Sequence, residues 1–184
     1  MSTKKRIAIN GFGRIGRAFF RMSHEHPEFE VVAINDLGDI NSLAYLLRYD
    51  TVYGHAPYSV ATEPQALIVD GRKIRYVSER DPEKLPWKEC EVDLVVESTG
   101  IFTSYEKASV HLKAGAKRVV ITAPVKDDGT EGKTILMGVN EEALSTCSIT
   151  SNASCTTNAA SPLVGILNAV LGIEKAILNT VHAY

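Results

Sequence analysis

The sequence predicts an α/β protein with a doubly wound parallel sheet, followed by the start of a second, truncated α+β domain. Short apolar runs alternate with segments of helical period, and several of the runs are almost entirely apolar, as are parallel strands buried on both faces. Near residue 153 the pattern changes to one long helix and a single apolar strand. We therefore expect one domain over residues 1–152 and the beginning of another over 153–184, the chain being a fragment of a longer one.

The first half of the sheet is expected to alternate strands with helices and then to add several short strands. Asp39 precedes the second helix and has a side chain that favours the N-cap position. Asp70-Gly71 predicts a tight turn between two short strands. In chain order the expected elements are strand 6–9, helix 14–23, strand 29–34, helix 40–47 and short strands within 60–77.

The second half repeats the alternation and leads into the long helix. Gly115 and Gly172 are expected to end helices, since glycine readily adopts the left-handed conformation that follows a last helical turn. The expected elements are strand 92–97, helix 104–114, strands 118–121 and 134–137, a helix from 154 or 155 to 171, and strand 176–181. Two successive halves of this kind are typical of a doubly wound sheet.

Composition excludes several classes of protein. Of the 184 residues, 45% are hydrophobic and 23% are charged, which excludes a disordered chain, a collagen or a disulfide framework. The net charge of −2 gives no sign of a nucleic-acid or anionic-membrane partner, and no run approaches the ~18 apolar residues of a membrane span. The three cysteines, Cys90, Cys147 and Cys155, are irregularly spaced and fit a reducing compartment. We expect a cytoplasmic protein without a metal site.

A glycine motif follows the first expected strand directly and opens the first helix. Its first glycine permits a tight turn, its second lets the backbone approach a pyrophosphate, and its third lets helix and strand pack closely. The free N–H groups of the helix N-terminus would face the anion. The motif therefore predicts a Rossmann-type dinucleotide site formed by Gly11, Phe12, Gly13, Arg14, Ile15 and Gly16.

Asp36 ends the second expected strand, where a carboxylate would accept hydrogen bonds from the ribose hydroxyls of a dinucleotide. The same carboxylate would repel the 2′-phosphate of NADP, and no Lys or Arg stands in 35–38 to offset it. We therefore expect NAD rather than NADP. The alternative is that Asp36 merely caps a helix that begins at Leu37.

Cys155 stands at the expected start of the long helix, where the helix dipole favours a thiolate. A thiolate is a nucleophile towards an aldehyde, and the flanking hydroxyls of Ser154 and Thr156 could bind a phosphate. The alternative is a small buried cysteine in a helix cap. His182, at the end of the last expected strand, could return to Cys155 as a base, or could be structural.

The remaining histidines and cysteines are interpreted as structural. The histidines fall in segments expected to be surface helix or loop, without metal-ligand spacing, and the cysteines do not begin a helix. They are His24, His26, His55, His111, Cys90 and Cys147.

These motifs together resemble the phosphorylating glyceraldehyde-3-phosphate dehydrogenase family. Residues 9–17 resemble the family's opening motif, and residues 151–158 (SNASCTTN) reproduce its active-site signature. Segments 49–50, 78–82, 97–100 and 138–140 match in order between them. The resemblance covers essentially the whole chain, but only the N-terminal part of the family's sequence.

The resemblance implies an NAD-dependent phosphorylating aldehyde dehydrogenase of glycolysis, which oxidises glyceraldehyde 3-phosphate to 1,3-bisphosphoglycerate through a cysteine thioester. It implies that Cys155 is the nucleophile, that His182 activates it, and that Ser154 and Thr156 contact the substrate or the attacking inorganic phosphate. It also implies cofactor contacts by the backbone of Arg14 and Ile15 and by Asp36, Arg80, Thr99, Phe102 and Thr122. The full-length form is expected to be a homotetramer.

Two departures and two alternatives accompany this resemblance. Ala159 replaces a second cysteine that the family usually has, and the chain reads His182-Ala183-Tyr184 where the family commonly has His-Ser-Tyr-Thr. Erythrose-4-phosphate dehydrogenase shares the signature but hydrolyses its thioester. The other alternative is a non-catalytic NAD-binding module, and we expect the isolated chain to be an inactive NAD-binding fragment.

Overall fold

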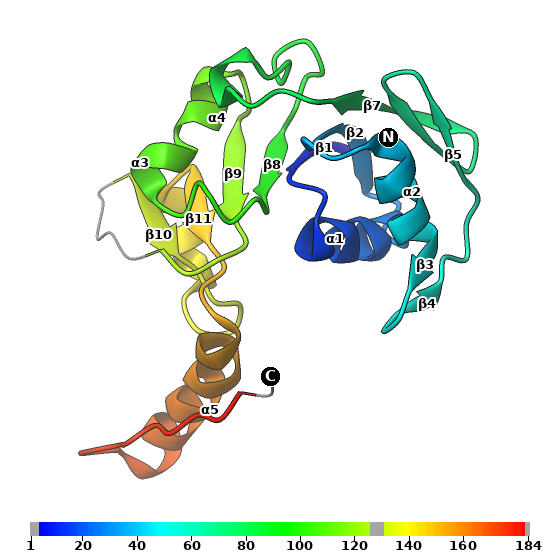
Figure 1. Cartoon of the computed structure of the whole chain (residues 1–184). Helices are drawn as coiled ribbons and strands as arrows, with labels where there is room; N and C mark the ends of the chain where they lie inside the picture. The colour runs from blue at the N-terminus through cyan, green and yellow to red at the C-terminus, as the bar shows by residue number, and fades with distance from the viewer. Residues whose placement is uncertain (1–3, 126–130, 183–184) are drawn as a thin grey trace.

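A computed structural model describes residues 4–125 and 131–182 (Figure 1). The strands are β1 Lys5–Asn10, β2 Phe29–Asn35, β3 Tyr49–Asp50, β4 Gly54–His55, β5 Val60–Glu63, β6 Ala66–Val69, β7 Arg72–Val77, β8 Leu94–Glu97, β9 Arg118–Ile121, β10 Gly132–Thr134 and β11 Ile149–Ser151. The α-helices are α1 Arg14–His24, α2 Ile40–Arg48, α3 Tyr105–Ala108, α4 Val110–Lys113 and α5 Cys155–Leu171, and the 3₁₀ turns are Pro82–Lys84 and Glu141–Thr146.

The main sheet has nine strands in the order β10-β11-β9-β8-β1-β2-β7-β6-β5. From β10 to β7 every neighbouring pair is parallel, whereas β6 and β5 continue the sheet as an antiparallel hairpin. The order β7-β2-β1-β8-β9-β11 is that of a doubly wound fold, with the direction of winding reversed between β1 and β8. The predicted fold class is therefore confirmed.

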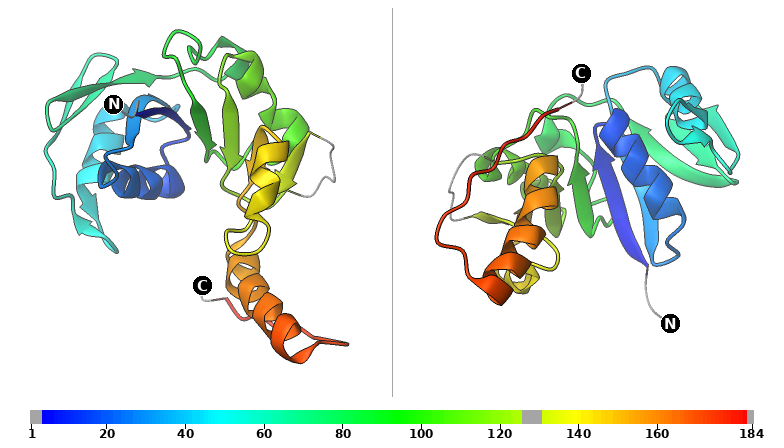
Figure 2. Two further views of the ribbon diagram at one scale, coloured as in Figure 1. Left: turned by 180° about the vertical axis from the view of Figure 1, so that it is seen from behind. Right: turned by 90° about the horizontal axis from the view of Figure 1, so that it is seen from below.

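Two hydrophobic cores lie on opposite faces of this sheet. Because successive strand residues point to opposite faces, Ile7 and Ile9 join one core while Ala8 joins the other. The first core includes residues of α1 and α2, and the second includes residues of α3 together with the fully buried Trp87. The helices of the two halves thus cover opposite faces of the sheet, as two views of the ribbon show (Figure 2).

Most expected elements form within a few residues of their predicted ends. Asp39 caps α2 as expected, since its carboxylate accepts a hydrogen bond of 2.8 Å from the backbone N–H of Ser42. The helix expected over 104–114 is divided into α3 and α4 at Ser109, whose hydroxyl donates to the carbonyl of Glu106. The strand expected over 134–137 lies earlier, as β10, and β11 has only three residues and was not expected.

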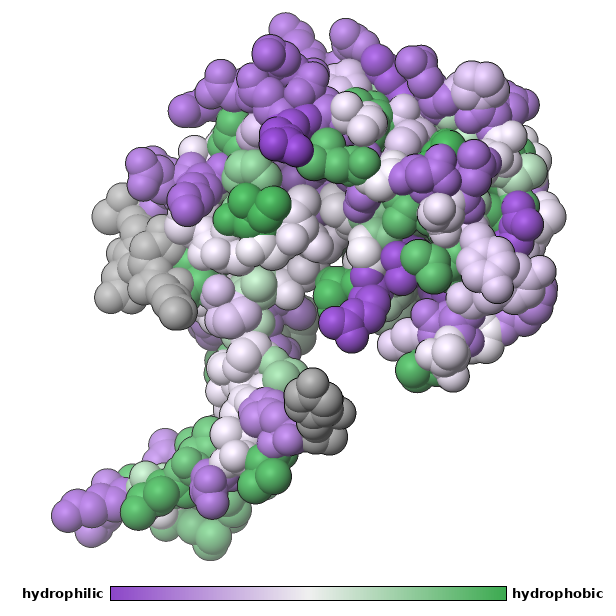
Figure 3. All heavy atoms as spheres, in the orientation of Figure 1, coloured by the Kyte–Doolittle hydropathy of each residue, from purple (hydrophilic) through white to green (hydrophobic). Residues whose placement is uncertain are grey.

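The strand predicted over 176–181 is wrong. Residues 173–182 form neither helix nor strand and run back beside α5, with Ile177 98% and Val181 94% exposed (Figure 1). A strand needs a neighbour for its backbone hydrogen bonds, and none of the described strands lies beside this segment. α5 itself has no buried residue, and its apolar side chains show on the surface (Figure 3). Among the described residues, no helix is long and apolar enough to cross a membrane.

Candidate functional site

A crevice opens at the carboxyl ends of the central strands, where the winding of the sheet reverses. Ligands of doubly wound proteins bind at this place. The cavity has a volume of about 570 Å³ and lies between the ends of β1, β2, β7 and β8. Its lining comprises Asn10, Gly11, Gly13, Asn35, Asp36, Leu37, Glu79, Arg80, Pro82, Leu85, Ser98, Thr99, Ile101 and Phe102.

The three glycines of the motif differ in what surrounds them. Gly11 has a φ of +91°, and a methyl group added there would lie 2.7 Å from the backbone nitrogen of Thr99. A methyl group on Gly16 would overlap the carbonyl oxygen of Gly11. Gly13, by contrast, is the N-cap of α1, has no capping side chain, and would meet no protein atom within 4 Å. The helix N-terminus is therefore open towards the crevice, as a bound pyrophosphate requires.

The other motif residues support this turn rather than line the crevice. Phe12 is buried, and its ring packs edge-on against that of Phe20 with the ring centroids 5.8 Å apart. Its side chain therefore points into the core, and its backbone is the part that belongs to the turn. The Arg17 guanidinium donates to the carbonyl of Phe12 at 2.9 Å, and burial lowers the pKa of Arg17. Arg14 and Ile15 are exposed on the first turn of α1, which leaves their backbone as the part available to a ligand.

Asp36 lines the crevice and is tied to the glycine turn. One carboxylate oxygen accepts from the backbone N–H of Phe12 at 2.6 Å, and the other accepts from that of Gly38 at 2.8 Å. The alternative that Asp36 caps a helix is wrong, because α2 begins after Asp39 and is capped by that residue. Tyr76 lies behind this loop and donates to the carbonyls of Asp36 and Gly38, and burial raises the pKa of Tyr76 to about 12.

The resemblance implies cofactor contacts at four further residues, and three of these residues line the crevice. Arg80, Thr99 and Phe102 all line the cavity, whereas Thr122 is not among the lining residues. Thr122 follows β9, and its hydroxyl donates to the carbonyl of Glu97 at 3.0 Å. It therefore lies one strand away from the walls of the crevice.

Several residues that no sequence motif predicts also shape the crevice. Asn10 and Asn35 are buried at the ends of β1 and β2, where the amide of Asn35 donates to the side-chain oxygen of Asn10 at 2.7 Å. The signal that could have found them is a polar residue at the end of an apolar strand. His111 was expected on a surface segment, but it is fully buried and bonds to Glu97 at 2.9 Å.

The cysteine signature forms the first turn of α5. Ser154 is the N-cap, its hydroxyl accepts from the backbone N–H of Thr157 at 3.1 Å, and Cys155 follows as the first helical residue. Cys155 is exposed, so the alternative of a small buried cysteine is wrong. His182 returns to this end of the helix, with its Nε2 atom 3.5 Å from the hydroxyl of Thr156 and 2.9 Å from that of Thr180.

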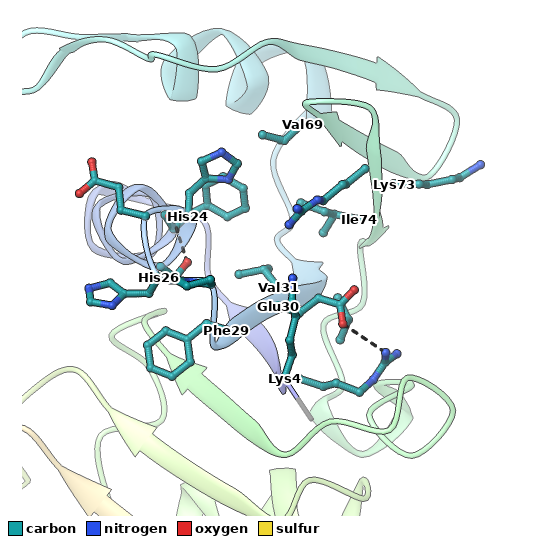
Figure 4. Close-up of a pocket in the computed structure, with 16 residues that line it drawn as sticks. Lys4, His24, His26, Phe29, Glu30, Val31, Val69, Lys73 and Ile74 are labelled. Atoms are coloured by element: carbon teal, nitrogen blue, oxygen red, sulfur yellow. Dashed lines mark hydrogen bonds and ion pairs between the residues drawn. The ribbon is translucent and has the colours of Figure 1, made fainter. Parts of the chain in front are cut away.

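A second hollow of about 540 Å³ lies near the start of β2 (Figure 4). It forms because β2 and β7 pair only over Ala33–Asn35 and Arg75–Val77 and diverge before that. Several of the polar side chains around it already have partners: Arg6 and Lys73 form ion pairs with Glu30 and Glu63, and the His24 ring lies 3.2 Å from a carboxylate oxygen of Asp70. We assign no ligand to it. Within the described residues, no three His, Cys, Asp or Glu side chains form a group that could hold a metal ion.

Comparison with known protein families shows which family this chain belongs to. The model of the NAD-binding domain of glyceraldehyde 3-phosphate dehydrogenase matches residues 5–105. The chain belongs to this family. The glyceraldehyde-3-phosphate dehydrogenase of Thermotoga maritima is 51% identical over 182 residues, covering 97% of this chain and 54% of the relative. Those of Geobacillus stearothermophilus and of the cytosol of Trypanosoma brucei brucei are each 49% identical, over 97% of this chain and 53% of theirs.

The predicted resemblance and NAD as the cofactor are thereby confirmed. The chain spans about half the length of the curated relatives that it matches. The matched domain contains β1, the glycine turn and Asp36, which are the parts of the crevice that the sequence motifs predict.

Proposed function

We propose that this chain supplies the NAD site and the nucleophile of a phosphorylating glyceraldehyde-3-phosphate dehydrogenase. The observation that carries the proposal is the exposed Cys155 at the start of α5, with His182 folded back to the same end of the helix. The division into an NAD-binding domain over 1–152 and a catalytic part from 153 belongs to the same proposal. So do inorganic phosphate as co-substrate, a homotetramer as the full-length assembly, and the cytoplasm as its location.

The open N-terminus of α1 suits the pyrophosphate of NAD, and Asp36 suits the adenosine ribose. A missing side chain at Gly13 leaves backbone N–H groups free for the anion, while the Asp36 carboxylate retains lone pairs for the ribose hydroxyls. Arg80, Thr99 and Phe102 would form the walls of the cofactor site. Thr122, which lies outside the crevice lining, is retained as a cofactor position on the resemblance alone. When bound, NAD supplies a hydride acceptor.

The chain's own residues would carry the substrate covalently. His182 would take the proton of the Cys155 thiol, the thiolate would attack the aldehyde carbon, and the same proton would return to the carbonyl oxygen to give a hemithioacetal. Loss of a hydride from this adduct to bound NAD, with its hydroxyl proton passing to His182, would leave a thioester on Cys155. Attack by inorganic phosphate would then release an acyl phosphate and restore the Cys155 thiol. The hydroxyls of Ser154 and Thr156 flank the sulfur in sequence and can donate to phosphate oxygens.

The test is NADH formation from glyceraldehyde 3-phosphate with and without inorganic phosphate, on this chain and on any longer product of its reading frame. Phosphate-dependent NADH from a longer product supports the proposal. Phosphate-independent turnover would assign the protein instead to a hydrolytic relative such as erythrose-4-phosphate dehydrogenase.

One observation favours NAD binding without turnover for the chain by itself. α5 has no buried residue, so nothing described holds Cys155 and His182 against the crevice. Because a displacement of about 1 Å can cost ~100-fold in rate, we expect the chain to bind NAD and to form no NADH. Alkylation of Cys155 no faster than that of Cys90 and Cys147 would support the hypothesis that the chain by itself binds NAD without turnover.

A further inference from the structure

A directed hydrogen-bond network lies beneath the crevice and converges on one carboxylate. β8 lies beside β1 in the sheet (Figure 1). Glu97 is the last residue of β8, pairs with Asn10 of β1 and is buried. One of its oxygens lies 2.6 Å from the amide nitrogen of Asn10 and 2.9 Å from Nε2 of His111. The other accepts from the backbone N–H of Thr99 at 2.8 Å and from the hydroxyl of Thr99.

The direction of each bond on the asparagine side follows from a backbone group that can only donate. The N–H of Glu79 donates to the side-chain oxygen of Asn35 at 2.9 Å, so the other atom of that amide is the nitrogen. That nitrogen donates to the side-chain oxygen of Asn10, and therefore the Asn10 atom that faces Glu97 is again an NH₂ group. Flipping Asn35 would set its NH₂ group against the Glu79 N–H, and flipping Asn10 alone would set the NH₂ groups of the two asparagines against each other.

The direction on the histidine side follows in the same way. The indole nitrogen of Trp87 is only a donor, and it lies 3.1 Å from Nδ1 of His111. Nδ1 must therefore be unprotonated, which leaves the proton on Nε2, facing Glu97. His111 is thus a neutral imidazole of one fixed tautomer, and its contact with Glu97 is a hydrogen bond rather than an ion pair.

We propose that Glu97 is an ionised positioning residue of the cofactor crevice. Three of its four partners, the Asn10 NH₂, the Nε2–H of His111 and the backbone N–H of Thr99, can only donate. The Thr99 hydroxyl is placed to donate as well, and it is the one group that could accept from a protonated carboxyl. Glu97 joins Asn10, directly before Gly11, to Thr99, whose backbone nitrogen crowds Gly11. Through Asn35 and Glu79 the same network reaches the ends of β2 and β7, so one charge aligns four strand ends that line the crevice.

This role rests on the proposed NAD site, and the variant Glu97→Gln tests it with little change of shape. The glutamine NH₂ would face either the Thr99 donors or the NH groups of Asn10 and His111. We expect the affinity of the 184-residue chain for NAD, measured by calorimetry, to fall at least ~10-fold, in line with the loss of a charged hydrogen-bond acceptor. The matched control Glu106→Gln, at an exposed carboxylate of α3, should bind NAD as the unaltered chain does.

A double variant separates this directed network from a merely structural carboxylate. In Trp87→Phe/Glu97→Gln the indole donor is gone, so His111 is free to carry its proton on Nδ1 and to accept from the glutamine NH₂ through Nε2. Only the Asn10 NH₂ group then opposes the glutamine, so we expect the double variant to lose less affinity for NAD than the losses in Trp87→Phe and in Glu97→Gln added together. Additive losses of affinity would overturn the proposal, because they would show that the direction of the bonds does not matter.

The tautomer of His111 can be measured directly by spectroscopy, without a variant and without NAD. Nitrogen-15 spectra of the unaltered chain should show His111 as the neutral Nε2–H tautomer. A charged His111, or the Nδ1–H tautomer, would overturn the network. Failure of the unaltered chain to bind NAD, with His111 in the expected tautomer, would instead count against the proposed cofactor site.

Discussion

At the scale of single residues, the crevice depends on glycines that have no side chain as much as on the side chains that line it. Gly16 has no side chain because the carbonyl of Gly11 occupies the space, whereas nothing in the protein occupies the space beside Gly13. Asp36 shows the complementary case of a side chain that two backbone N–H groups hold against the turn. Substitutions at different glycines of this motif should therefore change the stability of the fold and the binding of NAD separately.

The two glycines give a matched pair of variants. Gly16→Ala should lower the free energy of unfolding by roughly 1–3 kcal/mol or more, because the methyl group overlaps backbone that cannot move aside. Gly13→Ala should unfold at nearly the same temperature as the unaltered chain yet bind NAD weakly, since its methyl group fills the space meant for the pyrophosphate. Thermal unfolding and calorimetry check both, and full NAD affinity in Gly13→Ala would contradict the assignment.

Asp36 should set the choice of cofactor. In Asp36→Asn the repulsion of a 2′-phosphate is removed and hydrogen bonds to the ribose weaken, so we expect NAD affinity to fall ~10-fold and the preference for NAD over NADP to narrow. Titrations with both dinucleotides measure this. Asp39→Asn is the control, because that nearby carboxylate caps α2 and does not line the crevice. An unchanged ratio in Asp36→Asn would count against the assignment.

At the scale of elements, the local sequence accounts for where most helices and strands begin and end, and single side chains account for the remaining helix ends. Asp39 begins α2, Gly172 ends α5 with a φ of +75°, and Ser109 divides a helix that apolar spacing alone predicts as continuous. The strand predicted over 176–181 failed because a strand, unlike a helix, finds its hydrogen-bond partners outside its own segment.

The cap of α2 should be sensitive to acid. Hydrogen bonds from the backbone N–H and the hydroxyl of Ser42 hold the pKa of Asp39 below its ordinary value of 3.8. A lowered pKa means that the cap stabilises the fold above the pKa of the unfolded chain and loses this effect as the pH falls through the folded value. Urea unfolding should therefore show Asp39→Ala less stable than the unaltered chain at pH ~7, with the gap closing towards pH ~3. A gap independent of pH would contradict this.

At the scale of the whole molecule, the sheet and α5 differ in how they are held. The central strands are buried in two cores, whereas α5 and residues 173–182 project away from the sheet with apolar side chains exposed (Figure 1). Local stability follows burial, so the two parts should open independently.

Hydrogen exchange on the chain should reveal this difference. Amides of α5 should exchange orders of magnitude faster than those of β1 and β8, because no tertiary packing opposes the opening of the helix. The strands of the same sample provide the internal control. Equal protection of α5 and β1 would contradict the expectation and would show that α5 is held by contacts that this structure does not contain.

The sequence by itself determined the doubly wound class, the glycine turn, the acid at the end of β2 and the cysteine at the start of α5. Each of these follows from local rules: apolar period, the freedom of glycine and the preferences of helix ends. Only the tertiary structure decided that His111 is buried, that Asn10 and Asn35 join Glu97 beneath the crevice, and that residues 176–181 form no strand. These features depend on which residues meet across the sheet, and contacts between distant segments leave no period or spacing in a single sequence.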